Sequence, residues 1–411
     1  MTRRVISLFS GCGGMDIGFE GSFSCLKKSI NTAMHPDWIE EDYGDWALLS
    51  PTGFDTIFAN DIRSDAKCAW TTYFSNKRGR DISDMYRLGS IVDLVKRARA
   101  GEDIFPEGVD VVTGGFPCQD FSIAGKRQGF DSRRSHDGGV LEAGEPSIES
   151  RGQLYMWMRD VISITKPKLF VAENVKGLMD LADVKEVIER DFADACNGGY
   201  VVVPAQVLYA ADYGVPQSRA RVIFFGFKKS ALKKRALKAL TGDVIPPRYN
   251  PYPDKTHGIE GMPYVTCADA FIGLSEPEMT EDPSQRYYSK AKFMGTHCQG
   301  QTEVRLDSVG PTIRSEHHGN IEFRRLSPEH GGGHCAEIAA GLCERRLTVR
   351  ECARIQSFPD DYELVIQSGR RYAVSPSCGY KLVGNAVPPL LAYHIAKRIE
   401  QNWDYYFRSE K

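Results

Sequence analysis

The sequence predicts an α/β fold with a parallel sheet, followed by a second and less regular domain. Short apolar runs at residues 54–60 and 109–115 end beside an acidic residue or in two glycines, which is typical of buried parallel strands. Helical spacing at residues 91–100 and 154–165 alternates with these runs. The alternation is lost after residue 228, where proline, glycine, histidine and tyrosine become frequent. Because 411 residues exceed the size at which one hydrophobic core stops growing, two domains are expected.

Composition places the chain among ordinary globular proteins. Hydrophobic residues make up 42% and charged residues 26%, and the formal net charge is only −2, so a surface for nucleic acid must be a local basic patch. The 11 cysteines are odd in number and never spaced Cys-x-x-Cys, which argues against a disulfide framework and a zinc ribbon and favours reduced thiols inside a cell. No apolar run approaches the roughly 18 residues of a membrane helix. Membrane insertion and secretion are therefore not expected.

A glycine-rich turn joins the first predicted strand to a helix. Residues 5–9 form the strand, and Gly11, Gly13 and Gly14 follow it. Glycine lets the backbone approach a ligand closely, and N–H groups at a helix start favour anions, so this turn is a candidate nucleotide-binding loop; a purely structural turn is the alternative. The next strand delivers Asp61, whose carboxylate can hold both hydroxyls of a ribose or can instead cap the following helix.

Residues 109–122 present one cysteine at the end of a buried strand. Two glycines and then Phe116-Pro117 lead to Cys118, at the sheet edge where open α/β sheets bind ligands. Since free cysteines usually pack in cores, simple packing is the alternative to a nucleophile. The long segment 122–152 is rich in glycine and carries Lys126 and Arg127, which predicts a lid or a phosphate-contacting loop, with a solvated loop as the other interpretation.

Two further segments contain charged residues within predicted apolar strands. Glu173 lies in the strand-like run 169–178, where a buried carboxylate is costly unless it is paired or functional; a structural hydrogen bond is the alternative. Residues 200–209 and 211–226 are expected to form two antiparallel strands, whose connection carries Gln217, Arg219 and Arg221. Alternation along a strand would put both arginines on one cationic face.

Other segments receive structural interpretations. Residues 24–52 look like a polar insertion packed down by Trp38 and Trp46. Helices are expected at residues 184–196, 347–359 and 390–403. The second domain contains several histidines and Cys335, so a metal site is conceivable, but their spacing matches no familiar zinc pattern and no metal is expected.

Six short segments occur in a recognisable order. They are Phe9-Ser10-Gly11-Cys12-Gly13-Gly14, Gly115-Phe116-Pro117-Cys118-Gln119, Glu173-Asn174-Val175, Gln217-x-Arg219-x-Arg221, Arg346-Leu347-Thr348-x-Arg350-Glu351 and Gly384-Asn385-Ala386-Val387-Pro388. With them, the chain resembles the DNA (cytosine-5) methyltransferases of bacterial restriction–modification systems over nearly its whole length.

The resemblance implies a Rossmann-like, mixed seven-stranded sheet that binds S-adenosylmethionine, with a smaller, irregular target-recognition domain. The catalytic domain would comprise residues 1–228 completed by 377–411, and the target-recognition domain residues 229–376. The cofactor would be S-adenosylmethionine, leaving S-adenosylhomocysteine, with no metal. The partner would be double-stranded DNA. The chain would act as a monomer in the bacterial cytoplasm or nucleoid, beside a restriction endonuclease or other defence proteins without a stable complex.

The resemblance also assigns roles residue by residue. Cys118 would attack C6 of a flipped-out cytosine, Glu173 would hold N3 and Arg221 the base carbonyl. Arg219, Asn174 and Pro117 would support them. The cofactor would contact Phe9, Gly11, Gly13, Gly14, Met15, Asp61, Ile62, Ser90, Asn385 and Ala386. DNA would contact Gln119, Ser122, Lys126, Arg127, Gln299, Gly300 and Thr312. Two positions depart from the pattern: Ser90 stands where relatives usually have an aspartate for the adenine amino group, and Ala124 where many have a serine.

Three other functions fit less of the sequence. A tRNA cytosine methyltransferase with the same chemistry would carry Cys-Phe-Thr in a shorter small domain, and no such triplet occurs. A nicotinamide oxidoreductase would share the glycine turn but leaves Pro117-Cys118-Gln119 unexplained. A catalytically silent DNA-binding protein would be expected to lack Cys118 or Glu173, and both are present.

Overall fold

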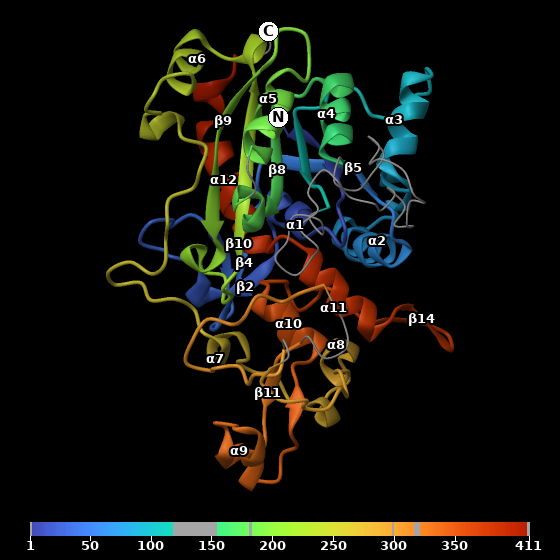
Figure 1. Ribbon diagram of the computed structural model, residues 1–411, viewed down its shortest axis with the longest axis vertical. Coiled ribbons are helices and arrows are strands. Elements are labelled where there is room, and N and C mark those ends of the chain that lie inside the picture. Colours follow the sequence, from blue (N-terminus) through green and yellow to red (C-terminus); the bar gives the residue numbers. More distant parts are fainter. Residues whose placement is uncertain (1, 118–153, 181–182, 298–299, 316–320, 409–411) are drawn as a thin grey trace.

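A seven-stranded mixed sheet forms the centre of the larger part of the molecule (Figure 1). The computed structural model describes residues 2–117, 154–180, 183–297, 300–315 and 321–408. In the sheet, β10 runs antiparallel to both neighbours and the other pairs are parallel, as the family resemblance implied. In sheet order the strands are β6 (Tyr86–Leu88), β5 (Phe54–Asp61), β1 (Arg3–Leu8), β7 (Val111–Gly115), β8 (Leu169–Val175), β10 (Ala220–Lys228) and β9 (Tyr200–Tyr209).

Helices cover both faces of this sheet. One face carries α3 (Ile91–Arg99), α4 (Leu154–Thr165) and α5 (Val184–Ala193), and the other α1 (Gly14–Glu20), α2 (Ser64–Arg78) and α12 (Pro389–Tyr406). Neighbouring strand residues therefore face two different cores: Val222 and Phe224 pack on the α3–α5 side, Ile223 and Phe225 on the other. The helices expected at 91–100 and 154–165 are confirmed as α3 and α4.

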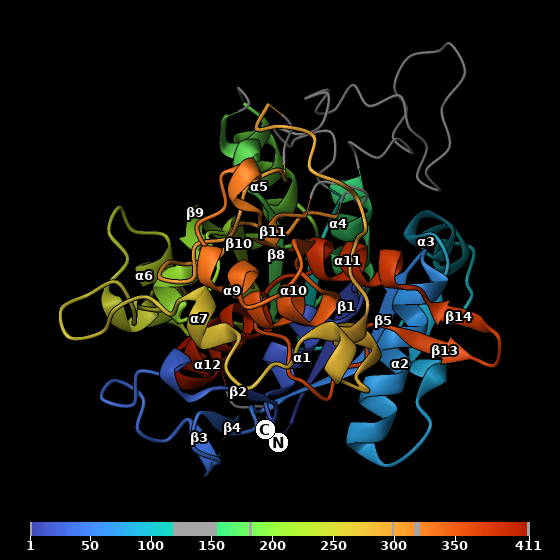
Figure 2. The same ribbon diagram turned by 90° about the horizontal axis from the view of Figure 1, so that it is seen from below.

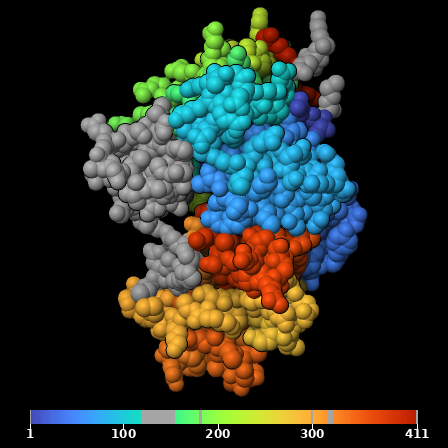
Figure 3. Space-filling view, turned by 90° about the vertical axis from the view of Figure 1, so that its right-hand side faces the viewer, coloured from blue at the N-terminus to red at the C-terminus, as the bar shows by residue number. Residues whose placement is uncertain are grey.

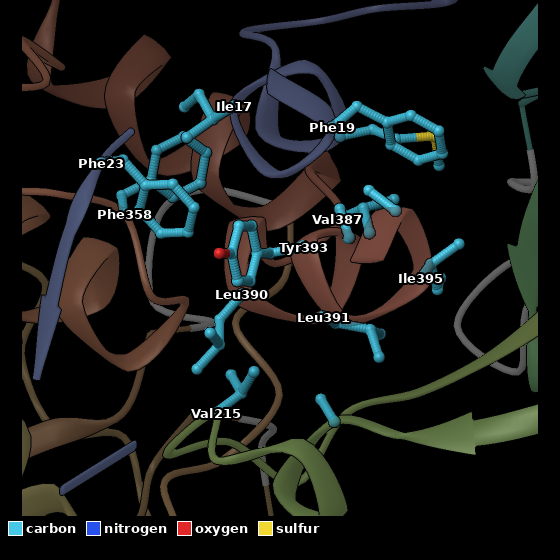
Figure 4. Close-up of a cluster of buried hydrophobic side chains, with 14 of the residues drawn as sticks. Ile17, Phe19, Phe23, Val215, Phe358, Val387, Leu390, Leu391, Tyr393 and Ile395 are labelled. Carbon is cyan, nitrogen blue, oxygen red and sulfur yellow. The ribbon is translucent and has the colours of Figure 1, made fainter. Parts of the chain in front are cut away.

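Helix α12 lies directly against α1 (Figure 4). A Cβ atom on Gly18 would lie 2.3 Å from the carbonyl oxygen of Pro389, so only glycine allows this approach. Leu390 and Tyr393 of α12 extend the same buried cluster. The guanidinium carbon of Arg3 lies 4.6 Å from the Trp403 ring centroid, which ties α12 to β1 as well.

The insertion expected at residues 24–52 contains a separate three-stranded antiparallel sheet. It consists of β2 (Ser24–Leu26), β4 (Trp46–Leu49) and β3 (Ile39–Asp42). Trp38 is buried beside Tyr393, with ring centroids 5.1 Å apart. The guanidinium of Arg354 lies over Trp46 at 4.5 Å. The prediction that both tryptophans pack this segment down is thus confirmed.

The second part of the chain is built from short elements at one end of the molecule, yellow to orange in Figure 3. They are α7 (Cys267–Ala270), α8 (Pro283–Arg286), α9 (Cys335–Ala339), α10 (Val349–Ile355), β11 (Phe323–Arg325) and β12 (Arg345–Arg346). Ion pairs of two buried arginines join them: Arg325 pairs with Glu276 and Glu337, and Arg345 with Glu276 and Glu351. Because buried charge is costly unless it is paired, these contacts hold the short elements in one arrangement.

Capping shortens the helix that the sequence predicts at 347–359. The Thr348 side chain accepts the Glu351 N–H, and the Glu351 carboxylate accepts the Thr348 N–H, so α10 begins at Val349. Helix α11 (Pro376–Asn385) was not expected as a separate helix; Ser375 caps it and Pro376 opens it. Before it, the hairpin β13 (Ile366–Ser368) and β14 (Arg371–Val374) projects beside α2 (Figure 2).

Residues that follow position 228 also contact the seven-stranded sheet. Helix α6 (Lys234–Leu240) packs near β9 and α12. The Tyr252 hydroxyl donates to the carbonyl oxygens of Ile223 and Pro204, at 2.9 and 3.0 Å. The domain division at residue 228 stays a prediction. No helix in the described ranges is long and apolar enough to cross a membrane.

Candidate active site

A cavity of about 630 Å³ opens at the carboxyl ends of β1, β5, β7 and β8. This is the sheet edge at which the sequence predicted ligand binding. Its wall includes most of the expected site residues that the structure describes: Phe9, Gly11, Gly14, Met15, Asp61, Ile62, Ser90, Pro117, Glu173, Arg219, Arg221, Thr312, Asn385 and Ala386. Gly13, Asn174 and Gly300 lie outside this wall. The expected cofactor and catalytic residues therefore share one cavity.

The glycine loop is fastened to Asp61 on the neighbouring strand. The Gly11 N–H donates to Asp61 Oδ2, and the Arg63 N–H to Asp61 Oδ1, both at 3.0 Å. Burial raises the Asp61 pKa, and these hydrogen bonds oppose that shift. The alternative that Asp61 caps the next helix is wrong, because α2 begins at Ser64 with Arg63 as its N-cap.

Three features of this end of the cavity fit the adenosyl group of S-adenosylmethionine. A Cβ atom on Gly11 would have nothing within 4 Å, so the space beside this backbone is open. Each carboxylate oxygen of Asp61 accepts one backbone N–H and keeps lone pairs for ribose hydroxyls. Ile62, 48% exposed, offers apolar surface at the cavity wall for a base.

The other end of the cavity carries a buried ion pair. Arg221 Nε lies 2.7 Å from Glu173 Oε1, and Glu173 is 8% exposed. Burial raises the Glu173 pKa, while the charges of Arg221 and Arg219 oppose the rise. A carboxyl group in this setting can hold a proton against a ligand nitrogen at a higher pH than an exposed glutamate can. The interpretation of Glu173 as a merely structural hydrogen-bonding group does not account for its place in the cavity wall.

Arg219 joins three parts of the chain. It lies just before β10 and donates to the carbonyl oxygens of Ile313 and Gly384, at 3.0 and 2.9 Å. Arg219 lies outside β10, but it and Arg221 both line the cavity, so the shared cationic face stays a prediction. Gln217, in the same motif, donates through Nε2 to Gln356 Oε1 at 2.6 Å. These contacts fix the start of β10 against the second part of the chain.

Asn174 holds the segment that leads to Cys118. Its Nδ2 donates to the Phe116 carbonyl oxygen at 3.2 Å, and its Oδ1 accepts the Val175 N–H. A Cβ atom on Gly115 would lie 2.8 Å from Glu173 Oε2, so a larger residue here would displace this carboxylate. The remaining predicted residues Cys118, Gln119, Ser122, Lys126, Arg127 and Gln299 lie outside the described residues.

The model of one protein family, the C-5 cytosine-specific DNA methylases, matches residues 3–401. The chain belongs to this family.

This DNA (cytosine-5) methyltransferase is similar to several curated methyltransferases along almost its whole length. It is 30% identical to the Type II methyltransferase M.BsuRI of Bacillus subtilis, covering 97% of this chain and 79% of that protein. It is 29% identical to the Type II methyltransferase M.NgoPII of Neisseria gonorrhoeae, and the match covers 97% of this chain and 95% of that protein.

Solved structures agree on the fold. The S. pombe Dnmt2 methyltransferase gives a TM-score of 0.53 at 17% identity, covering 97% of this chain and 98% of that one. The Entamoeba histolytica methyltransferase EhMeth gives a TM-score of 0.53 at 15% identity, and the match covers 98% of each chain. At these identities the likeness concerns the methyltransferase fold alone.

Three further predicted contact residues of the methyltransferase, Ser90, Thr312 and Gly300, have partners inside the protein. The Ser90 side chain accepts the Val92 N–H and caps α3. The Thr312 hydroxyl donates to the Ser218 carbonyl oxygen, and the Gly300 carbonyl oxygen accepts from Arg346 Nη1 at 2.6 Å. Among the residues that the structure describes, no three His, Cys, Asp or Glu side chains are grouped as metal ligands.

Sequence reasoning missed three side chains that surround the glycine loop of the methyltransferase. Asp16 accepts hydrogen bonds from Ser7 and Trp70, and Tyr86 and Tyr362 donate to carbonyl oxygens of Gly11 and Cys12. A lone acid two residues after Gly14 was the available signal for Asp16. The two tyrosines carry no local signal, because they are distant from the loop in sequence.

Proposed function

We propose that this methyltransferase transfers a methyl group from S-adenosylmethionine to carbon 5 of a cytosine within a specific double-stranded DNA sequence, through covalent attack by Cys118. The observation that carries the proposal is the buried Glu173–Arg221 pair, which shares one cavity with the Gly11–Asp61 end suited to the cofactor. The pair provides a proton-holding carboxyl and a fixed cation where a base would enter.

Covalent attack addresses the low reactivity of the substrate. Carbon 5 of cytosine is a poor nucleophile, and addition of a thiolate at C6 turns it into an enamine carbon. A bond forms between the Cys118 sulfur and C6, and C5 can then accept the methyl group that bound S-adenosylmethionine supplies. A base or water removes the proton from C5, and the sulfur–C6 bond breaks to release the thiolate. Asn174 supports this role for Cys118, because it holds the Phe116 carbonyl two residues earlier.

Glu173 and Arg221 would act on the ring that Cys118 attacks. Addition at C6 pushes negative charge toward N3, and the Glu173 carboxyl can share or donate a proton there. Arg221 holds Glu173 in place and offers its remaining N–H groups to the base carbonyl. Arg219 would add positive charge, because its field already reaches Glu173. The thiol of Cys118 would normally have a pKa of about 8.5, and nearby positive charge favours its thiolate.

The base must leave the duplex before this chemistry, at a cost of a few kcal/mol. Gln119 and the segment 122–152, with Ser122, Lys126 and Arg127, are proposed to close over it. Residues 229–376, with Gln299, Gly300 and Thr312, are proposed to read the target. Several relatives are named Type II methyltransferases, which supports a role in protecting host DNA within a restriction–modification system. Such a protein would act as a monomer in the bacterial cytoplasm, without a stable complex with an endonuclease.

Transfer of tritium from labelled S-adenosylmethionine tests the substrate class. We expect label in duplex DNA and none in tRNA or in protein alone. Label in tRNA and not in DNA would contradict the proposal.

The covalent step is tested with Cys118→Ser, which should abolish transfer and leave S-adenosylhomocysteine binding nearly unchanged. Cys335→Ser is the matched control, because Cys335 is exposed in α9. A duplex containing 5-fluorocytosine should trap a denaturation-resistant adduct with the wild type and with Cys335→Ser. If Cys118→Ser forms the adduct or turns over at the wild-type rate, the covalent route through Cys118 is wrong.

A further inference from the structure

Two buried tyrosines hold consecutive carbonyl groups of the glycine loop. The Tyr86 hydroxyl donates to the Gly11 carbonyl oxygen at 2.9 Å, and the Tyr362 hydroxyl to the Cys12 carbonyl oxygen at 2.6 Å. Tyr86 opens the edge strand β6, whereas Tyr362 lies in the turn after α10. The loop is thus held from two separate parts of the chain.

The loop has a backbone conformation that needs such support. The φ angles of Phe9, Gly11 and Gly13 are +52°, +52° and +79°, in the left-handed region. A non-glycine residue there is disfavoured, and strained residues persist only where their surroundings fix them. A loop with these angles and without external hydrogen bonds would also sample other conformations.

Both tyrosines are placed to donate under all ordinary conditions. Tyr86 is 1% and Tyr362 0% exposed, so water does not compete for their hydroxyl groups. Burial raises the pKa of both phenols well above the ordinary value, so they keep their protons. Their rings are also fixed by neighbours: Tyr86 lies 5.4 Å from the Trp70 ring and Tyr362 4.8 Å from the Tyr73 ring.

The direction of a carbonyl sets the direction of the next N–H, because the peptide unit is planar and trans. Gly11 and Cys12 both line the cavity. When Tyr86 holds the Gly11 carbonyl oxygen on its own side, the Cys12 N–H points the opposite way. The hydroxyl groups therefore fix both the path of the loop and the orientation of its peptide groups.

Tyr362 extends this support to the second part of the chain. Its own carbonyl oxygen accepts from Arg350 Nη1 at 3.2 Å. Arg350 Nε in turn donates at 2.7 Å to Asp282, the residue that caps α8. The cofactor loop and α8 are therefore joined through one buried arginine.

We propose that Tyr86 and Tyr362 are positioning residues that hold the glycine loop in the conformation that binds S-adenosylmethionine. This inference rests on the proposed function, because it takes the loop as the cofactor site. Removing either hydroxyl leaves a buried carbonyl without its donor, and the loop then spends less time in the binding conformation. The apparent dissociation constant rises by the inverse of the remaining fraction.

Isothermal titration of S-adenosylhomocysteine, without DNA, tests the proposal. The variants are Tyr86→Phe, Tyr362→Phe and the double variant, which keep the rings and remove the hydroxyls. Tyr200→Phe is the matched control: its buried hydroxyl donates to the Pro167 carbonyl oxygen at 2.8 Å, at the opposite end of the sheet. We expect about a tenfold rise in Kd for each single variant, which corresponds to about 1.4 kcal/mol, and a larger rise for the double variant. Tyr200→Phe should bind like the wild type.

Steady-state kinetics on duplex DNA give a second measurement. The KM for S-adenosylmethionine should rise in both single variants, while kcat at saturating cofactor stays close to that of the wild type. If both variants lower the melting temperature as Tyr200→Phe does but leave Kd and KM unchanged, the tyrosines are structural only and the proposal is wrong. If one variant does not fold, the other decides the question alone. A wild-type protein that binds no S-adenosylhomocysteine would instead contradict the proposed function itself.

Discussion

Asp16 offers a pH-dependent test of how the glycine loop is supported. It lies in the first turn of α1, is 1% exposed, and accepts from Ser7 Oγ at 2.6 Å and Trp70 Nε1 at 2.7 Å. Burial raises its pKa to about 7, and the two hydrogen bonds only partly oppose this rise. The change Asp16→Asn keeps the size of the side chain. Its amide oxygen can accept from Trp70 and its amide N–H can donate to the Ser7 hydroxyl, but the titrating group is gone.

The direction of the effect follows from proton binding. Well below pH 4 the carboxyl is protonated in the folded and unfolded states, and its burial carries no ionisation cost. As pH rises toward 7, the unfolded chain releases this proton while the folded protein keeps it, so the free energy of unfolding falls by about 1.36 kcal/mol per pH unit. From pH 5 to pH 7 the wild type should therefore lose about 2 kcal/mol relative to Asp16→Asn, because half of the folded molecules have released the proton at pH 7, with little further change above pH 8.

Urea unfolding of both proteins at pH 5, 6, 7 and 8 measures this difference directly. Other titrating groups affect both proteins alike, so the difference between them isolates Asp16. A difference that stays constant over this range would refute the raised pKa and the reasoning from burial.

Three further changes probe the cavity and the sheet. Glu173→Gln should lower kcat by about 10²- to 10⁴-fold, because no carboxyl group is left to donate a proton to N3 of the base. Binding of S-adenosylhomocysteine should stay near the wild-type value. A nearly normal kcat in a tritium-transfer assay would contradict the role of Glu173. Ser90→Asp should keep the cap of α3, since aspartate caps as well as serine, and it adds a carboxylate to the cavity wall. Calorimetry should therefore show tighter S-adenosylhomocysteine binding. Weaker binding would mean that the side chain at position 90 does not contact the adenine. Gly226→Ala would place a Cβ atom 1.9 Å from Phe170 Cε1 and should cost about 1–3 kcal/mol in urea unfolding. Gly242→Ala, with nothing closer than 3.5 Å, is its control, and equal stability of the two variants would show that the sheet relaxes freely.

Local patterns in the sequence were enough to predict the sheet and its ligand-binding edge. The run 109–115 is β7, the run 169–178 contains β8, and residues 200–209 are β9. β7 and β8 are buried on both faces, so their apolar runs are continuous and stand out, whereas β9 at the sheet edge is partly exposed. The pairing of Glu173 with an arginine could also be predicted, because the motifs at residues 173–175 and 217–221 contain the opposite charges.

Contacts between distant segments could not be predicted in this way. The spacing of Arg219 and Arg221 did not predict that the Arg219 guanidinium bonds carbonyl oxygens more than ninety positions away, at Ile313 and Gly384. The phenols of Tyr86 and Tyr362 reach the loop only because the sheet and the turn after α10 bring them there. Helix α11 was missed because its two glycines obscure the helical pattern, whereas packing stabilises it.

The contact between α1 and α12 has a consequence for synthesis on the ribosome. Helix α1 carries the glycine loop at its start and is made early, but Gly18 packs against Pro389, Ala392 and Tyr393 of α12, which are made near the end. At about 5–20 residues per second, roughly 20 to 70 s pass between the translation of the two helices. During this time the nascent catalytic sheet lacks α12, one of the three helices that cover one of its faces. A premature stop before residue 389 therefore yields an unfinished core, and not a slower enzyme.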